Sequence, residues 1–179
     1  MVPMVRAMVV FDATVLLLTL DPNTPPPLDS QTGKPVTNPK ERIDYLIKTL
    51  EDDRTKIVVP TPVLSEVLVR AGQAGPSYLP IIERSSAFKI EPFDIRAAIE
   101  VAHMAEGVRN TGKRKGPNVQ TYAKVKYDRQ IVAIAKTVNA TSIYTDDKDL
   151  KSLAENHGLK VIRIAEIPLP PEDPQIQMY

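Results

Sequence analysis

Short apolar runs and helical patterns alternate along the chain. Strands are expected at residues 8–11, 56–59, 88–91, 141–144 and 160–164, of which 8–11 is fully apolar and 56–59 is rich in β-branched residues. Between them, apolar residues recur at helical spacing, as in Ile43, Leu46, Ile47 and Leu50. Strands that alternate with helices predict an α/β fold with a central, mostly parallel sheet flanked by helices on both faces.

Two segments lack this periodicity. Residues 21–39 contain six prolines among Asn, Thr, Ser and Gly, a density that excludes a packed helix or strand. Residues 107–127 are rich in Lys and Arg and contain no acidic residue. We interpret both segments as long surface loops. Gly107 is then expected to end a helix that begins at residue 95, and Asp128 to open the next one.

Capping residues predict where several other helices begin and end. Thr61 is expected to cap a helix that has Pro62 at its first position and ends at Gly72. Asp94 is expected to cap the helix that follows the 88–91 strand. This capping role is sufficient to explain Asp94, and no chemistry is assigned to it.

Size and composition indicate one ordinary globular domain. The chain has 179 residues, of which 42% are hydrophobic and 25% charged, and we expect a domain at 1–170 with a Pro-rich tail at 171–179. The net charge of +1 requires any nucleic-acid-binding surface to be local. The absence of Cys excludes disulfides, thiolate metal sites and Cys nucleophiles. It also fits a reducing cytoplasm, where we expect the protein.

An acidic residue interrupts the most apolar run of the chain. Asp12 directly follows the first expected strand and precedes a run of Ala, Thr, Val and Leu. A carboxylate in such surroundings costs free energy unless a metal ion or hydrogen-bond donors hold it. The simpler alternative is that Asp12 only caps the following helix. The same run, from Ala7 to Leu20, is too short to span a membrane, and no membrane association is expected.

Three further acidic residues should gather near Asp12. Glu66 lies in the first turns after the 56–59 strand, Asp147 follows the 141–144 strand, and Asp128 opens the helix that leads into that strand. The carboxyl ends of parallel strands meet at one edge of a sheet, where ligands bind. Taken singly, Glu66 is explained as a solvated helix flank, and Asp128 and Asp147 as favourable charges at helix N-termini.

Four neighbouring carboxylates without His or Cys favour a hard cation. Their mutual repulsion would raise their pKa values unless cations neutralise them. All-oxygen ligand sets suit Mg²⁺ or Mn²⁺, which activate water and stabilise charge on a phosphodiester under attack. The chemistry that fits is hydrolysis of a nucleic-acid backbone.

The motifs around these acids resemble those of PIN-domain ribonucleases, and especially of the VapC-type toxins of toxin–antitoxin pairs. The likeness extends from about Met8 to Ile164. It rests on Asp12-Ala13-Thr14 after the first strand, Thr61-Pro62-Val63-Leu64-Ser65-Glu66-Val67, Tyr127-Asp128-Arg129-Gln130-Ile131-Val132-Ala133-Ile134-Ala135, and Tyr144-Thr145-Asp146-Asp147-Lys148-Asp149-Leu150. Each motif alone is weak, but four in this order are specific. The resemblance implies a PIN-like three-layer fold.

The resemblance also assigns roles to residues. It places Asp12, Glu66 and Asp128 on the family's first three acids and Thr14 on a family hydroxyl position. The last family motif, Thr-x-Asp, implies that Thr145 supplies a supporting hydroxyl and that the fourth acid is Asp147, with the nearby alternatives Asp146 and Asp149.

The activity that the resemblance implies is that of a Mg²⁺- or Mn²⁺-dependent endoribonuclease acting on RNA, with an antitoxin partner and a homodimeric assembly. The segments 21–39 and 107–127 look longer than in compact toxins, which weakens the toxin assignment more than the nuclease one. The cluster of Lys113, Arg114 and Lys115 is a candidate RNA phosphate contact, or alternatively only a solvated loop.

Other function classes fit less well. A catalytically silent PIN-like module that binds RNA or protein is the main alternative. Phosphotransfer domains of the haloacid-dehalogenase type also carry Asp after the first strand, but they require a second Asp where Thr14 stands. Receiver domains require an acidic pair that is missing here. The chain contains neither the nucleophile elbow of hydrolases nor a Gly-rich nucleotide-binding loop.

Overall fold

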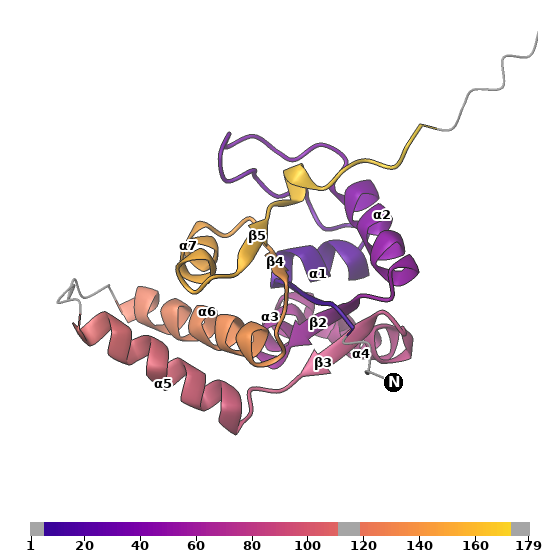
Figure 1. Cartoon of the computed structure of the whole chain (residues 1–179). Coiled ribbons are helices and arrows are strands. Elements are labelled where there is room, and N and C mark those ends of the chain that lie inside the picture. Colours follow the sequence, from indigo (N-terminus) through magenta and orange to yellow (C-terminus); the bar gives the residue numbers. More distant parts are fainter. Residues whose placement is uncertain (1–5, 111–118, 173–179) are drawn as a thin grey trace, which may run out of the picture.

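The centre of the molecule is a parallel five-stranded sheet, which confirms the predicted fold class (Figure 1). The computed structural model describes residues 6–110 and 119–172, with only the backbone described for 107–110 and 119–123. The strands are β1 (Met8–Phe11), β2 (Lys56–Pro60), β3 (Phe88–Glu91), β4 (Ser142–Tyr144) and β5 (Lys160–Ile162). Their order is β3-β2-β1-β4-β5, and all neighbouring pairs are parallel.

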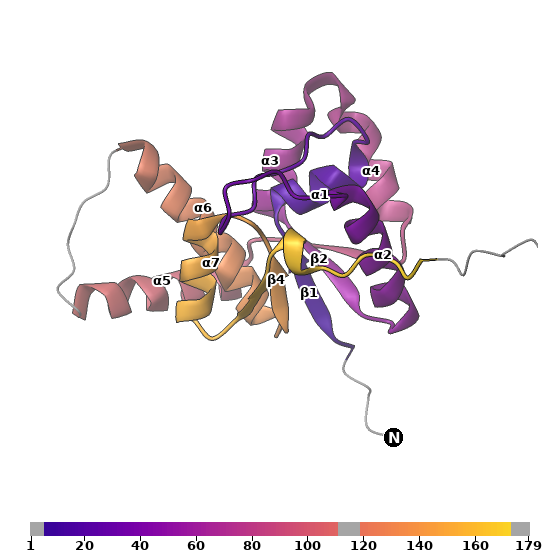
Figure 2. The same ribbon diagram turned by 90° about the horizontal axis from the view of Figure 1, so that it is seen from above.

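Helices connect the strands and cover both faces of the sheet (Figure 2). They are α1 (Ala13–Leu20), α2 (Pro39–Asp52), α3 (Thr61–Ala71), α4 (Gly75–Arg84), α5 (Ile95–Asn110), α6 (Val119–Thr137) and α7 (Lys148–Asn156), with short 3₁₀ turns η1 (Gly72–Ala74) and η2 (Ile164–Glu166). Within the described part of the chain, no helix combines the length and the apolar character that crossing a membrane requires.

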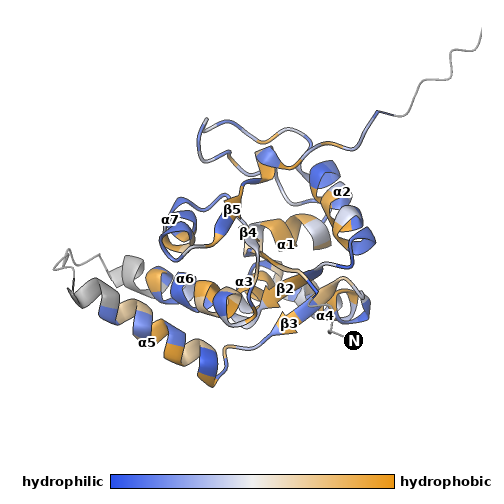
Figure 3. Cartoon of the chain, viewed as in Figure 1, coloured by the Kyte–Doolittle hydropathy of each residue, from blue (hydrophilic) through white to orange (hydrophobic). Residues whose placement is uncertain are grey.

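Alternating side chains of the strands build two hydrophobic cores. Val9 and Phe11 of β1 pack with Ile43 and Leu46 of α2 on one face of the sheet. Val10 faces the opposite core, which is shared with residues of α3, α4, α5, α6 and α7. Side chains of α1 enter both cores, and Figure 3 shows this helix as hydrophobic along most of its length. Because both faces are buried, the strands are nearly continuous apolar runs.

The predicted loop at 107–127 is mostly helical, so that prediction is wrong. Helix α5 continues through Gly107 to Asn110, and α6 already begins at Val119. Asp128 therefore lies in the middle of α6 and does not open it. Lys, Arg, Gln and Ala are good helix formers even without an apolar stripe, and one helical Gly costs only about 1 kcal/mol. The Lys113–Lys115 cluster lies outside the described residues.

The start of α3 differs by one position from the prediction. Pro60 occupies the capping position and makes no side-chain cap, and Thr61 is the first helical residue. The Thr61 hydroxyl instead accepts a hydrogen bond from the backbone N–H of Phe93, at 3.0 Å, and so ties α3 to the connection after β3. Gly72 ends α3 as predicted. The predicted cap is also present at α5, where Asp94 Oδ1 accepts from the Ala97 N–H at 3.0 Å.

The Pro-rich segment between α1 and α2 is an ordered loop. It lacks a helix or named strand, as predicted, although Pro39 belongs to α2 and an isolated antiparallel bridge joins Leu28 to Pro35. Val36 is buried in the core beside α2. Asp29 forms an ion pair with Arg163 at 2.6 Å, which fastens the loop to the end of the sheet beyond β5.

Candidate active site

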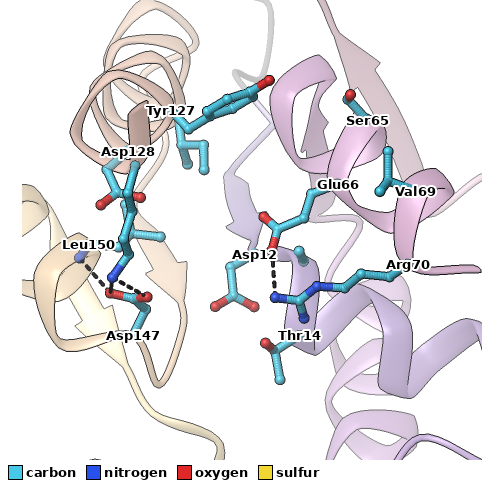
Figure 4. Close-up of a pocket in the computed structure, with 13 residues that line it drawn as sticks. Asp12, Thr14, Ser65, Glu66, Val69, Arg70, Tyr127, Asp128, Asp147 and Leu150 are labelled. Atoms are coloured by element: carbon cyan, nitrogen blue, oxygen red, sulfur yellow. Dashed lines mark hydrogen bonds and ion pairs between the residues drawn. The ribbon is translucent and has the colours of Figure 1, made fainter. Parts of the chain in front are cut away.

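A cavity of about 480 Å³ opens at the carboxyl ends of the central strands. Its walls come from the N-terminal ends of α1 and α7, the middle of α3 and the middle of α6. All four acids predicted from the sequence line it. The lining residues are Asp12, Ala13, Thr14, Ser65, Glu66, Val69, Arg70, Lys124, Tyr127, Asp128, Ile131, Asp147 and Leu150. Figure 4 shows Asp128 and Asp147 on one side and Glu66 on the other, with Asp12 between them.

Asp12 is both a helix cap and a buried carboxylate of the cavity. Its Oδ1 accepts a hydrogen bond from the Val15 N–H of α1 at 2.8 Å, which is the capping role that the sequence allowed. The residue is only 6% exposed. Burial raises the pKa of Asp12 to about 7, against the lowering effect of hydrogen bonds from Thr145 and Val15. Asp12 can therefore cap α1 and also serve as a carboxylate of the cavity.

Thr145 links the first and last acids. Its hydroxyl, fully buried, donates a hydrogen bond to Asp12 Oδ2 and accepts one from the backbone N–H of Asp147 at 3.0 Å. The turn after β4 and the turn after β1 are thereby held together. Thr14, the other predicted hydroxyl, lines the cavity at the start of α1.

Asp128 reaches the cavity from one turn of α6 rather than from a helix end. It is 8% exposed. Burial, together with the nearby charge of Asp147, raises the pKa of Asp128 to about 6, against the lowering effect of Lys124. Both buried acids thus hold protons more tightly than free carboxyl groups do, which is the electrostatic state that a bound cation would relieve.

Asp147 caps α7 and faces a lysine. Its Oδ1 accepts hydrogen bonds from the N–H groups of Asp149 and Leu150, at 2.8 and 3.0 Å. Lys124 Nζ lies 2.9 Å from its Oδ2. Burial acts to raise the pKa of Asp147, but the Leu150 and Lys124 hydrogen bonds outweigh burial and hold the pKa below its ordinary value.

Glu66 completes the acidic lining from α3. Its Oε1 lies 2.6 Å from a guanidinium nitrogen of Arg70, one turn further along the helix. Both side chains are substantially exposed at the mouth of the cavity. Glu66 is therefore the most solvated of the four acids.

The geometry distinguishes Asp147 from the two neighbouring candidates. Asp146 does not line the cavity, and its Oδ2 accepts a hydrogen bond from the Ile164 N–H at 3.1 Å. Asp149 also lies outside the lining and pairs with Lys124 at 2.6 Å. Asp147 is the acid of this motif that lines the cavity, and its charge acts on Asp128, whereas the charge of Asp146 acts on Asp12 from outside the lining.

The donor set suits a hard divalent cation, although its side chains are turned to other partners. The four carboxylates provide only oxygen atoms, as Mg²⁺ and Mn²⁺ prefer. Among the residues that the structure describes, no group of three His, Cys, Asp or Glu side chains is positioned to bind a metal ion. Glu66 instead pairs with Arg70, and Asp147 pairs with Lys124.

Sequence reasoning did not assign Arg70 or Lys124 to the site. Arg70 follows Glu66 at the i, i+4 spacing that favours ion pairs on a helix, so this signal was present in the sequence. Lys124 precedes Asp128 by the same spacing, but its contacts with α7 depend on how the two helices cross. Tyr127 also lines the cavity and is 50% exposed.

Comparisons with known proteins agree with this fold. The PIN domain family model matches residues 36–156, more than half of the chain. A structure of VapBC2 from Rickettsia felis, bound to a DNA fragment from its promoter, has a TM-score of 0.57 at 13% identity over 87% of this chain and 98% of that chain. DNA-bound VapBC from Salmonella typhimurium has a TM-score of 0.53 at 16% identity, over 88% and 98%. The comparison with curated protein sequences gives no match.

The two structural likenesses, at such low identity, show a shared fold alone. The family match is of another kind, because it covers the motifs of Glu66, Asp128 and Asp147 and the strands β2, β3 and β4. It confirms the resemblance that the sequence motifs indicate. The chain belongs to the PIN domain family.

Proposed function

We propose that the protein is a metal-dependent endoribonuclease that hydrolyses RNA phosphodiester bonds. The observation that carries the proposal is the convergence of Asp12, Glu66, Asp128 and Asp147, from four separate helices and turns, on one cavity. These acids would hold one or two Mg²⁺ or Mn²⁺ ions, which would activate water and stabilise charge on the phosphate. Membership of the PIN family supports this reading.

In this proposal, other residues of the chain position the carboxylates that would bind the metal. Thr145 holds the Asp12 carboxylate in place through its hydrogen bond. At the N-terminus of α7, two backbone N–H groups donate to the Asp147 carboxylate and so favour the rotamer in which it lines the cavity. Asp12 and Asp128, with pKa values of about 7 and 6, become fully ionised ligands once a cation offsets their burial.

Substitution of Asp12 by Asn tests the proposal. With Mn²⁺ and a mixed RNA pool, we expect cleavage by Asp12→Asn to fall at least about 100-fold, because even outer-shell partners of metal ligands change activity by 10–100-fold. Asp94→Asn is the matched control, since Asp94 also caps a helix but lies outside the cavity. EDTA should abolish cleavage by the wild-type protein.

Two results would contradict the nuclease proposal. Undiminished cleavage by Asp12→Asn would show that the metal site is misassigned. Calorimetric Mn²⁺ binding without cleavage of any RNA would favour the alternative of a silent PIN-like module that binds RNA or protein.

We further propose that the protein is the toxin of a toxin–antitoxin pair. The support is the fold shared with the two VapBC structures. Expression should then arrest growth, and co-expression with the product of a small adjacent reading frame should restore it. Asp12→Asn should abolish the arrest.

Homodimerisation remains a prediction, which light scattering of the purified protein would test.

A further inference from the structure

The ammonium group of Lys124 lies among the acidic side chains of the cavity. Lys124 Nζ lies 2.9 Å from Asp147 Oδ2 and 2.6 Å from Asp149 Oδ2. Lys124 and Asp128 are one helical turn apart on α6 and both line the cavity. One ammonium group therefore contacts one proposed metal ligand and acts electrostatically on a second.

This ammonium competes with any divalent ion that binds the same carboxylate. Both charges would draw on the oxygens of Asp147, and their like signs repel each other. The competition is nevertheless weak. The side chain of Lys124 is 43% exposed and that of Asp147 35%, and exposed ion pairs change equilibrium constants by about fivefold at most. A divalent ion can therefore displace the lysine.

A displaced Lys124 would remain at the cavity. Its backbone is fixed in α6, while its four-carbon side chain is flexible and carries a compact charge that suits phosphate oxygens. The acids of the cavity would repel an RNA backbone, so a cation at this wall is needed to hold the phosphate. The opposite wall has the same arrangement in the Arg70–Glu66 pair.

We propose that Lys124 is an internal counter-ion of the cavity that a divalent metal displaces and that then contacts the RNA phosphate. This inference rests on the proposed function for its second step, the RNA contact. Its first step, competition with the metal, concerns the protein without RNA.

The first test measures metal binding alone. In calorimetric titrations of RNA-free protein with Mn²⁺, Lys124→Gln should bind Mn²⁺ about fivefold more tightly than the wild type, the most that loss of an exposed ion pair provides. Lys124→Arg, which keeps the charge, should resemble the wild type. Lys40→Gln is the matched control, because Lys40 also forms an exposed ion pair, with Asp44 on α2, away from the cavity.

The second test measures RNA binding. With saturating Mn²⁺, fluorescence anisotropy of a hydrolysis-resistant phosphorothioate RNA should show about fivefold weaker binding to Lys124→Gln, the usual size of one exposed charge contact. Lys40→Gln should be unchanged. Thermal melts of all variants verify folding.

The outcomes separate the two proposals. Equal or weaker Mn²⁺ binding by Lys124→Gln would overturn the counter-ion role. Unchanged RNA affinity would overturn the phosphate contact. A wild-type protein that binds Mn²⁺ but cleaves no RNA would refute the nuclease proposal, and the metal competition of Lys124 would still be measured independently.

Discussion

At the scale of a single residue, hydrogen bonding and burial have opposite effects on the charge of Asp12. Its two oxygens have good hydrogen-bond donors in Val15 and Thr145, yet burial still raises its pKa to about 7. In the absence of a cation, the folded protein at neutral pH must keep either a proton or an unfavourable buried charge there. A residue that weakens the fold in this way is typical of a functional position.

This conflict predicts that Asp12→Asn stabilises the metal-free protein at neutral pH. A carboxyl group whose folded pKa is raised contributes stability below its unfolded pKa of 3.8, and loses that contribution as pH rises toward about 7. A shift of this size corresponds to an upper bound of about 4 kcal/mol. We expect a gain of about 2 kcal/mol for the variant at pH 8, measured by urea unfolding in EDTA, and no such gain at pH 4.

The control for this prediction is another capping aspartate. The hydrogen bond from the Ala97 N–H lowers the pKa of Asp94, so Asp94→Asn should gain no stability as pH rises. Added Mn²⁺ should stabilise the wild type and leave Asp12→Asn unaffected, because only ligands that bind the folded state stabilise it. A wild type whose stability rises between pH 4 and 8 relative to Asp12→Asn would contradict the argument.

At the scale of elements, strands and amphipathic helices were predictable, whereas the hairpin of α5 and α6 was not. The strand at Met8–Phe11 follows from its continuous apolar run, because it is buried on both faces, and α2 follows from its apolar stripe, because burial there repeats every third to fourth residue. The adjoining ends of α5 and α6 contain Gly107 and show no such repeat. Their helical state depends on backbone hydrogen bonds and on packing between the two helices (Figures 1 and 2).

The site also contains residues whose positions follow from the sequence and residues whose contacts depend on how the helices pack. Asp12 and Asp147 could be placed from sequence because each directly follows a strand, and parallel strands end at one edge. Asp128 was placed at the correct edge although its helix begins earlier than expected. The contacts of Lys124 with Asp147 and Asp149 could not be predicted, because they require the position of α6 relative to α7.

The Pro-rich loop should depend on one ion pair for its order. Asp29 and Arg163 are mostly buried, and Arg163 has a second partner in Glu166 at 3.2 Å. Loss of Asp29 should therefore release the loop locally, while Arg163 keeps Glu166 as a partner. In hydrogen exchange, Asp29→Ala should speed exchange of the Val36 amide, which bonds to the Pro27 carbonyl at 2.9 Å, by about 5–30-fold.

Asp44→Ala provides the comparison for the loop. Asp44 pairs with Lys40 on the exposed side of α2, next to the loop in sequence but outside it. Its loss should leave exchange at Val36 unchanged. If both variants exchange alike, or if neither differs from the wild type, the Asp29–Arg163 pair does not order the loop.

At the scale of the whole molecule, the charge is nearly balanced, and attraction of RNA must be local. The net charge is +1, while residues 107–127 carry six Lys and Arg and no acid. This segment leads directly into the part of α6 that lines the cavity at Lys124 and Asp128. A basic segment that precedes this part of α6 in the sequence would hold the polyanion whose phosphates the acids repel.

The salt dependence of RNA binding tests whether this basic region contacts phosphates. For single strands, each neutralised phosphate contributes about 0.7 to the slope of log K against log salt. If Lys113, Arg114 and Lys115 each contact one phosphate, their joint replacement by Gln should reduce that slope by about 2. Joint replacement of Lys34, Lys40 and Lys48, which are exposed on the Pro-rich loop and α2, should leave the slope unchanged. Equal slopes for the two triple variants would show that the 113–115 cluster is only a solvated stretch, and that binding depends on the cavity itself.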